Sequence, residues 1–239
     1  MNLTDDQTPE AAEHEQLVVM LNDDTFRDEY EKSCANPRLG VIPTFFGSIL
    51  TGTANLLYGR KPSYLKFRAI EIIARVPYHS WAAVAHTLLT LFYWDEQKAL
   101  KLCADNDFAR LSQENETMHV IVISKLTHEE RRGNFLVHTL FPILFAFVYY
   151  WASYLMYLVR PRWSLQLNYL FENHAYHQYD RFLRENEQAL KNKIVASEFL
   201  LWYGRDPLSQ YEFFQSVRND ELIHRNKSLH AANTDTLKS

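Results

Sequence analysis

Apolar residues recur every three to four positions through most of the chain. This period is typical of amphipathic helices, whereas a half-buried strand would alternate apolar and polar residues. Helix breakers or polar clusters separate the periodic segments. The pattern predicts five long helices, at residues 64–93, 96–127, 135–159, 163–190 and 194–231. The apolar stretch at residues 39–58 adds a sixth helix, so we expect an all-α protein.

Two of these six helices are unusually apolar. Pro43, Gly47 and Gly52 interrupt residues 39–58, and this suits a helix lying at a surface. Residues 139–159 carry no charge and are long enough to cross a bilayer. Tyrosines and a tryptophan occupy the middle of that segment, whereas spanning helices place such residues at the two interfaces. The aromatic pattern therefore speaks against a transmembrane span.

The chain of 239 residues fits one domain, which we place at residues 38–232. Residues 1–37 are acidic and polar, and they predict a poorly ordered tail with one short helix around 17–21. Residues 233–239 are expected to form a C-terminal tail. The first fifteen residues lack the basic start and apolar run of a secretory signal, and transit peptides avoid acids. We therefore expect a mature chain that stays on the cytoplasmic side.

Composition narrows the class of protein. Hydrophobic residues make up 47% and aromatic residues 14%, which favours helices with a partly lipid-facing surface. The net charge of −4 gives no reason to expect a nucleic acid as partner. Cys34 and Cys103 lie far apart without CxxC spacing, which argues against a disulfide framework and a thiolate metal site. We expect both to be buried or idle thiols.

Acidic residues interrupt apolar helical segments at four places. They are Glu71, Glu116 with His119, Glu172, and Glu221 with His224. Positions i and i+3 share a helix face, so each Glu-x-x-His pair presents an oxygen and a nitrogen in the same direction. Four glutamates and two histidines from four helices form the ligand set of di-iron carboxylate bundles. Their four charges also nearly cancel two ferrous ions, which makes burial tolerable.

Each of these places also has a purely structural interpretation. Glu71 has Arg68 and Arg75 at helical spacing and could pair with them on a surface. Glu221 and His224 could belong to an exposed helix end. Glu116 with His119, and Glu172, could be solvated residues on a helix surface. With 17 Glu and 10 His in 239 residues, chance gives about 0.7 Glu-x-x-His matches, so two matches alone are weak. Their alternation with single glutamates on separate helices favours the metal site.

Further polar residues flank this set. Asn115 and Asp220 each precede a glutamate of a pair and are candidates to support the histidine rings or the opposing helix. The other histidines fit no ligand spacing and are expected at core, interface or surface positions. They are His14, His79, His86, His128, His138, His174, His177 and His230.

The acidic residues lie within four recognisable segments. These are FRAIEIIARVPY from Phe67, NETMH from Asn115, ENHAYHQYDRFL from Glu172 and RNDELIH from Arg218. In this order they resemble the motifs of the alternative oxidase family, most closely its plastid terminal oxidase branch. The resemblance runs over residues 39–230. It implies a ferritin-like di-iron four-helix bundle and two further helices that dock on one membrane leaflet.

The resemblance also implies an activity and a set of site residues. The reaction is oxidation of a quinol coupled to reduction of dioxygen to water, without proton pumping. Tyr179 matches a tyrosine that the family keeps near the irons and is our candidate catalytic residue, as a redox relay. In the same resemblance, Trp202 corresponds to a tryptophan of the family. The ligands of the two irons would be Glu71, Glu116, His119, Glu172, Glu221 and His224.

The quinol pocket departs from the family pattern at one position. Lys66 stands where the family usually carries arginine, so it offers a single donor point instead of a fork. We expect Lys66, Ile70, Ala175 and Gln178 to bind the quinol, which is plastoquinol or ubiquinol. The other expected partners are dioxygen and a membrane, and a homodimer is left open. The expected location is peripheral and monotopic, on the cytoplasmic face of a bacterial plasma membrane or on a thylakoid.

Four other functions agree less well with the sequence. A quinone hydroxylase shares the ligand set but lacks the ARVPY and YDRFL flanks found here. A lipid desaturase requires HxxxH boxes, and no such box is placed to serve the site. A ferritin-like iron-storage protein would have a soluble exterior, which the aromatic segment 139–159 opposes. A non-enzymatic membrane scaffold would leave the buried glutamates unexplained.

Overall fold

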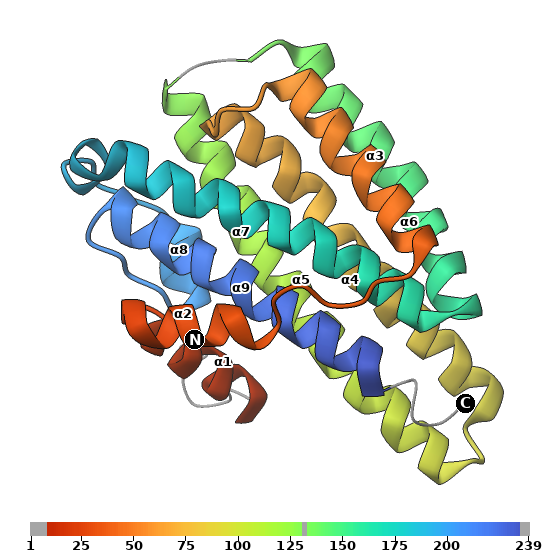
Figure 1. Ribbon diagram of the computed structural model, residues 1–239. Helices are drawn as coiled ribbons and strands as arrows, with labels where there is room; N and C mark the ends of the chain where they lie inside the picture. Colours follow the sequence, from red (N-terminus) through yellow and green to blue (C-terminus); the bar gives the residue numbers. More distant parts are fainter. Residues whose placement is uncertain (1–8, 131–132, 235–239) are drawn as a thin grey trace.

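The computed structural model describes residues 9–130 and 133–234 of the chain (Figure 1). Within these ranges every regular element is helical, which confirms the all-α prediction. In chain order the helices are α1 (Pro9–Met20), α2 (Asp24–Ser33), α3 (Val41–Tyr58), α4 (Tyr64–Phe92), α5 (Glu96–Glu130), the π-helical turn η2 (Leu136–Leu140), α6 (Phe141–Val159), α7 (Pro161–Lys191), α8 (Glu198–Tyr203) and α9 (Gln210–Thr234).

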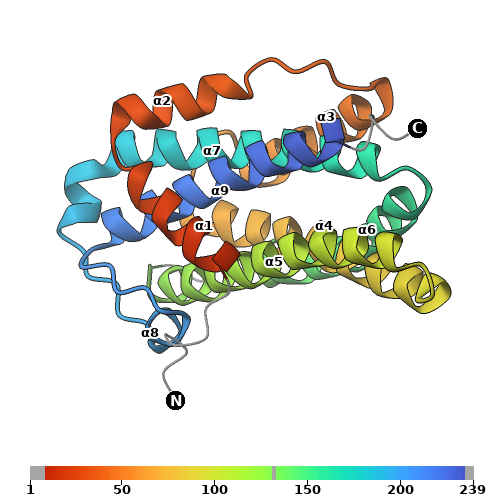
Figure 2. The same ribbon diagram turned by 90° about the horizontal axis from the view of Figure 1, so that it is seen from below.

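Four long helices form the bundle that positions the site. Helix α4 packs along α5, and α7 packs along α9. Figure 2 shows the two pairs as two layers, with α7 and α9 facing α4 and α5. Apolar side chains fill the space between the layers, with Phe67, Tyr179 and Phe214 in one core cluster. The predicted four-helix bundle is therefore present.

Local signals set several helix ends. Ser63 caps α4 by accepting a hydrogen bond from the backbone N–H of Lys66. Ser197 caps α8 in the same way. The single helix predicted over 194–231 is wrong, because α8 and α9 are separate. Gly204 ends α8 with a φ of 99°, a left-handed conformation that favours glycine, and Pro207 follows in the connecting loop.

The expectation of a poorly ordered segment before residue 38 is not met over the part that the structure describes. Helices α1 and α2 lie against the bundle, and α1 packs on α9. Val18 and Leu21 are buried against Leu222 and Ile223 of α9, and Asp23 caps α2. A few apolar side chains of this segment pack on α9 and stabilise it. The segment is otherwise polar, so its sequence alone does not predict this packing. Residues 1–8 of the predicted N-terminal tail and residues 235–239 of the tail predicted at 233–239 lie outside the described residues, and residues 233–234 belong to α9.

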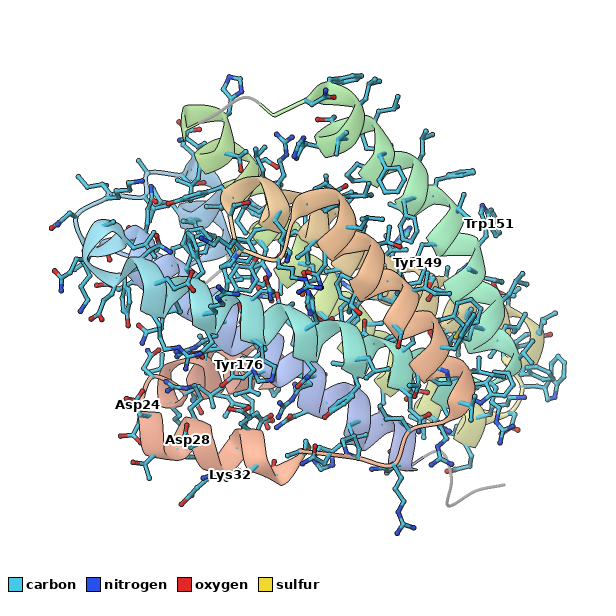
Figure 3. All side chains as sticks on the ribbon, turned by 45° about the horizontal axis from the view of Figure 1, so that its top comes forward. Asp24, Asp28, Lys32, Tyr149, Trp151 and Tyr176 are labelled. Atoms are coloured by element: carbon cyan, nitrogen blue, oxygen red, sulfur yellow. The ribbon has the colours of Figure 1, made fainter. Side chains whose placement is uncertain are left out.

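Helices α3 and α6 cover one face of the bundle and leave most of their apolar side chains exposed. Both are long and apolar enough to cross a membrane, yet only 17% and 22% of their most apolar windows are buried. Figure 3 shows Trp151 on the outer side of α6 and Tyr149 on the inner side. Helix α6 packs on α4 and α7, and α3 packs on α7. Both helices therefore lie along the bundle, and their outer faces form a large apolar surface.

Candidate metal centre

The six predicted ligands meet in the middle of the bundle. Glu71 comes from α4, Glu116 and His119 from α5, Glu172 from α7, and Glu221 and His224 from α9. Each side chain is fully buried. The surface interpretations of these residues are therefore wrong. The spacing of these residues along the chain places each of them on the apolar face of its helix. The packing of the four helices then brings those faces together.

The six side chains form two overlapping groups. One contains Glu71, Glu116, His119 and Glu221, and the other contains Glu116, Glu172, Glu221 and His224. In each group the possible ligand atoms lie within 4.8 Å of one another. Glu116 and Glu221 belong to both groups, which is the arrangement that bridging carboxylates require.

The distances around the two histidines define the groups further. His119 Nδ1 lies 3.3 Å from a Glu71 oxygen and 3.4 Å from a Glu221 oxygen. His224 Nδ1 lies 2.8 Å from Glu116 Oε1. His119 belongs to one group and His224 to the other, and both imidazoles lie close to the shared carboxylates of Glu116 and Glu221. The Glu-x-x-His spacing produces this geometry because each pair occupies one helix face.

Many polar atoms at the centre have no hydrogen-bond partner among the described residues. They include both carboxylate oxygens of Glu116 and of Glu221 and the Nδ1 atoms of His119 and His224. Buried polar atoms are normally paired, because an unpaired one loses its hydration without compensation. Cations coordinated by these atoms would supply the missing interactions. Carboxylate oxygens and imidazole nitrogens in this number fit two iron ions.

The crowded carboxylates are shifted towards their protonated forms in the metal-free protein. Burial, reinforced by the charge of Glu116, raises the pKa of Glu71 to about 7. The same two causes raise the pKa of Glu172 to about 8. Burial and the neighbouring glutamates also raise the pKa of Glu221 well above its usual value. Metal ions would compete with these protons, because ligation requires the carboxylate form.

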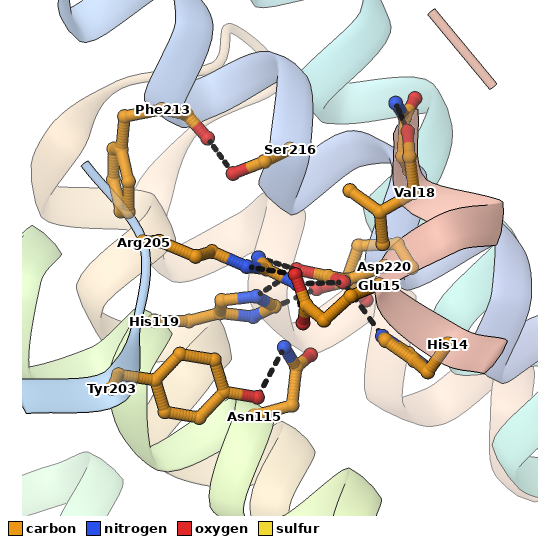
Figure 4. Close-up of polar contacts among 12 residues, drawn as sticks. His14, Glu15, Val18, Asn115, His119, Tyr203, Arg205, Phe213, Ser216 and Asp220 are labelled. Atoms are coloured by element: carbon orange, nitrogen blue, oxygen red, sulfur yellow. Dashed lines mark hydrogen bonds and ion pairs between the residues drawn. The ribbon is translucent and has the colours of Figure 1, made fainter. Parts of the chain in front are cut away.

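Asp220 supports His119 from outside the ligand cluster. His119 Nε2 lies 2.9 Å from Asp220 Oδ2, which leaves Nδ1 turned towards the glutamates. Two other groups reach the same carboxylate: Arg205, whose nitrogens lie 2.5 and 2.9 Å away, and His14, at 2.9 Å (Figure 4). Burial would raise the pKa of Asp220, but Arg205 lowers it well below its usual value. Asp220 is therefore held as a carboxylate that can orient the histidine.

Several of these contacts were not predicted from sequence. The sequence pattern indicates only an ordinary core, interface or surface position for His14 and gives no role to Arg205. Glu15 was missed as well, although its carboxylate binds Arg205 through two hydrogen bonds of 3.0 and 2.7 Å. On the other side of the site, Tyr78 donates to Glu172 Oε1 at 2.7 Å. Only tertiary packing brings His14, Glu15 and Arg205 together, so no spacing along the chain marks them. Tyr78 lies seven residues after Glu71 on α4, and that spacing could have placed it on the same helix face.

Tyr179 also lies at the cluster. Its hydroxyl donates a hydrogen bond to Glu71 Oε1. The ring stacks on Phe67 with centroids 4.0 Å apart, and it is fully buried. Burial and the charge of Glu71 raise the pKa of Tyr179 well above its usual value, so the phenol keeps its proton. The position seven residues after Glu172 places both side chains on the same face of α7.

A family model described as alternative oxidase matches residues 28–233, which is most of the chain. The chain belongs to the alternative oxidase family. This is the family that the four sequence motifs indicated, and its di-iron carboxylate type agrees with the buried glutamate and histidine cluster. A curated relative is ubiquinol oxidase 4, chloroplastic/chromoplastic, of Arabidopsis thaliana, which is 30% identical over 165 residues. That match covers 66% of this chain and 42% of the relative, so the chain spans less than half of the relative's length.

Asn115 and Trp202, two further residues that the family resemblance singled out, differ in their burial. Asn115 is buried beside Glu116 and donates a hydrogen bond of 3.2 Å to the hydroxyl of Tyr203. Its amide oxygen has no partner among the described residues. Trp202, in contrast, is 61% exposed. Tyr203 rather than Trp202 therefore approaches the centre from α8.

The predicted quinol-binding residues of this alternative oxidase family member lie between α4 and α7. Lys66 is fully buried, and its ammonium donates to Asn55 Oδ1 at 2.9 Å, to the Gly59 carbonyl at 3.0 Å and to Gln178 Oε1 at 2.9 Å. All three acceptors are neutral. Burial therefore lowers the pKa of Lys66 to about 8. Ala175 is buried on the α7 face that contacts α4.

An apolar pocket opens between α3 and α6 beside these residues. Its walls come from Leu50, Leu57, Ile70, Phe141, Phe145 and Phe171, among other apolar side chains. Helix α4 supplies Ile70, which is one of the four predicted quinol contacts, and α3 and α6 supply the two sides. The pocket therefore joins the exposed apolar surface to α4, and its lining residue Ile70 directly precedes Glu71 in the chain.

Proposed function

We propose that this alternative oxidase oxidises two quinols and reduces one dioxygen to two waters at a di-iron centre. Two quinols supply the four electrons and four protons that the reduction of one dioxygen to two waters requires. The observation that carries this proposal is the buried cluster of four glutamates and two histidines with unsatisfied ligand atoms. The family match supports the same reaction.

The six residues have separable roles in holding the metal. We assign Glu71 and His119 to one iron and Glu172 and His224 to the other, with Glu116 and Glu221 shared between them. The two groups of mutually close ligand atoms support this division. Four carboxylate charges would balance two ferrous ions in a site that excludes water. When bound, the irons would supply dioxygen binding and one-electron chemistry.

The surrounding residues would orient the ligands and deliver the substrate. Asp220 fixes the orientation of His119, and Tyr78 does the same for one oxygen of Glu172. We propose Tyr179 as the redox relay, because its hydroxyl contacts Glu71 while its ring stacks on Phe67, the residue after Lys66 on α4. Substrate access would run through the apolar pocket, with Ile70 and Ala175 against the quinol ring. The quinol is plastoquinol or ubiquinol.

We further propose that α3 and α6 dock in one leaflet without crossing it. A single crossing by α6 would separate the helices that precede and follow it by a hydrocarbon layer of about 30 Å. Glu116 and Glu172 are carried by those two helices, yet their ligand atoms lie within 4.8 Å. A monotopic position on the cytoplasmic face of a bacterial plasma membrane, or on a thylakoid, keeps the cluster whole. Oxidation in such a position is proposed to proceed without proton pumping, and a homodimer is compatible with it.

The experiment uses purified protein loaded with ferrous iron and short-chain plastoquinol or ubiquinol. We expect about two irons per chain and two quinols consumed per dioxygen. Labelled dioxygen separates this reaction from that of a quinone hydroxylase, because an oxidase places the label in water and a hydroxylase places it in the quinone. Glu116→Ala should lose iron and oxygen uptake, whereas Glu114→Ala, an exposed neighbour on α5, should keep both. Full iron content and turnover in Glu116→Ala would contradict the site.

A further inference from the structure

A basic recess lies where the start of α3 meets the turn from α6 into α7. Its lining includes Arg38, Gly40, Arg160, Arg162, Trp163 and Gln166. The recess has a volume of about 230 Å³. Figure 1 shows the segment before α3 running alongside the α6–α7 turn, and this brings Arg38 next to arginines more than a hundred positions away.

The three arginines lack acidic partners within the part of the chain that the structure describes. No ion pair or hydrogen bond joins Arg38, Arg160 or Arg162 to a carboxylate there, whereas Arg205 and Arg218 are paired with aspartates. Arg160 contacts an aromatic ring, because its guanidinium lies 5.1 Å from the Trp163 ring centre. Three like charges around one recess repel each other. An anion placed between them would remove that repulsion.

The backbone around the recess adds to its positive potential. Helices α3 and α7 both begin there, and neither N-terminus has a side-chain cap. Helix N-termini carry partial positive charge, and α7 extends over 31 residues. Gln166 is 2% exposed and lines the recess. Its amide oxygen accepts the Gly40 N–H at 3.0 Å, while its amide N–H groups have no partner among the described residues.

The recess lies at the edge of the apolar surface formed by α3 and α6. Val41, at the first position of α3, is 86% exposed, and Val159, at the last position of α6, is 76% exposed. Trp163 is half-buried beside them, and tryptophan is the residue typical of membrane interfaces. With α3 and α6 docked in a leaflet, the recess would therefore sit at the depth of the lipid headgroups.

We propose that this recess binds the phosphate of an anionic phospholipid, with the acyl chains of that lipid lying along α3 and α6. The inference rests on the proposed membrane docking. Arginine forks match phosphate oxygens, and the Gln166 amide adds a neutral donor at the floor. A free phosphate offers the same oxyanion chemistry. The adjoining apolar surface favours the lipid, because a free ion would use only the recess.

The test measures binding of the iron-loaded protein to two kinds of vesicle. One kind is phosphatidylcholine alone, and the other is phosphatidylcholine mixed with phosphatidylglycerol. We expect tighter binding to the anionic vesicles. The triple variant Arg38→Gln, Arg160→Gln and Arg162→Gln should weaken that binding at least tenfold, about 1.4 kcal/mol, while binding to neutral vesicles stays the same.

A matched control removes the same charge elsewhere. Lys32→Gln, Arg110→Gln and Arg184→Gln change three exposed cations that do not line the recess. This control should keep the preference for anionic vesicles. An equal loss in the control, or none in the recess variant, would overturn the proposal and leave only general attraction between cations and the surface.

Two further measurements separate the possible causes. Inorganic phosphate that raises the melting temperature of the wild type, combined with no preference for anionic vesicles, would assign the recess to free phosphate and reject the lipid. Iron content and oxygen uptake with short-chain quinol in detergent test the proposed enzyme activity separately. Both should be unchanged in the recess variant, because no arginine of the recess belongs to the metal cluster or the quinol pocket.

Discussion

His14 Nε2 lies 2.9 Å from Asp220 Oδ1, although 206 positions separate the two residues. The other carboxylate oxygen of Asp220 contacts His119, one of the proposed iron ligands. Helix α1 thus reaches the metal centre through one aspartate. The family match begins at residue 28, after α1 has ended, so this contact comes from a part of the chain outside the matched region.

The first prediction concerns that contact. His14→Ala should lower the affinity for ferrous iron about tenfold, because it removes a contact of Asp220, and loss of the groups that support a metal ligand typically has this effect. Iron retained after dialysis against a graded series of chelator concentrations measures it. Glu13→Ala changes an exposed neighbour on the same helix and should behave as wild type. Equal iron retention in both variants would reduce His14 to packing.

Metal-free protein should become less stable as the pH rises from about 4.5 to about 8. The folded state raises the pKa of Glu71 to about 7 and of Glu172 to about 8, both from 4.5. Within that window the folded state holds more protons than the unfolded state, so rising pH favours unfolding. Their contribution to stability is complete below pH 4.5 and is lost as pH passes the folded pKa values. Denaturant unfolding at several pH values provides the measurement.

Removal of one of these buried charges should separate stability from metal binding. At pH 8, Glu221→Gln should raise the melting temperature of metal-free protein, because burial and neighbouring carboxylates oppose the charge of Glu221. In the wild type, saturating ferrous iron should add about 5–10 °C, and in the variant it should add almost nothing. Glu114→Gln, which is exposed, should match the wild type in both respects. An iron-dependent increase in Glu221→Gln equal to that of the wild type would contradict ligation by Glu221.

The role of Tyr179 is tested by Tyr179→Phe. This change keeps the ring that stacks on Phe67 and removes only the hydroxyl that donates to Glu71. We expect a folded, iron-loaded protein with turnover lowered at least tenfold, about 1.4 kcal/mol in the activation barrier. Oxygen uptake under saturating quinol gives the turnover, and iron analysis confirms the loading. Wild-type turnover in the variant would exclude Tyr179 as the relay.

Lys66 should affect both stability and quinol binding. Its ammonium is buried among neutral acceptors, and burial lowers the pKa from 10.5 to about 8. Below pH 8 both folded and unfolded states are protonated, and the burial penalty is constant. Between pH 8 and 10.5 the unfolded state holds the extra proton, so the wild type should gain stability relative to Lys66→Met as pH rises. In oxygen uptake the variant should raise KM for quinol, whereas Lys61→Met at an exposed position should change neither property.

The proposed monotopic arrangement is tested by accessibility to a thiol reagent that does not cross membranes. Native Cys103 is exposed on α5, before α6, and Cys34 is buried. A second protein carries Cys103→Ser and Asn192→Cys, which places the thiol after α7. Both thiols should react from the same side of sealed vesicles. Labelling from opposite sides would show that α6 crosses the membrane.

Helical periodicity alone determined which residues of this protein face inward. Glu116 with His119 and Glu221 with His224 occupy i and i+3 positions, so one helix face fixes their common direction before any helix packs. The same local rule predicted the all-α class and the long helices of the bundle. The four motifs that resemble the alternative oxidase family contain these inward-facing residues. The sequence alone therefore indicated the family.

Only the tertiary structure decided what surrounds that cluster. His14 and Arg205 contact Asp220, and Glu15 binds Arg205, because α1 and the α8–α9 loop pack against α9. No local pattern along the chain encodes these contacts. The packing of α1 and α2 against the bundle likewise depends on apolar contacts with α9. The spacing of residues along one helix fixes the direction in which their side chains point, because it depends on that helix alone. Contacts between distant segments depend on how complete helices pack, and this is decided by the whole core at once.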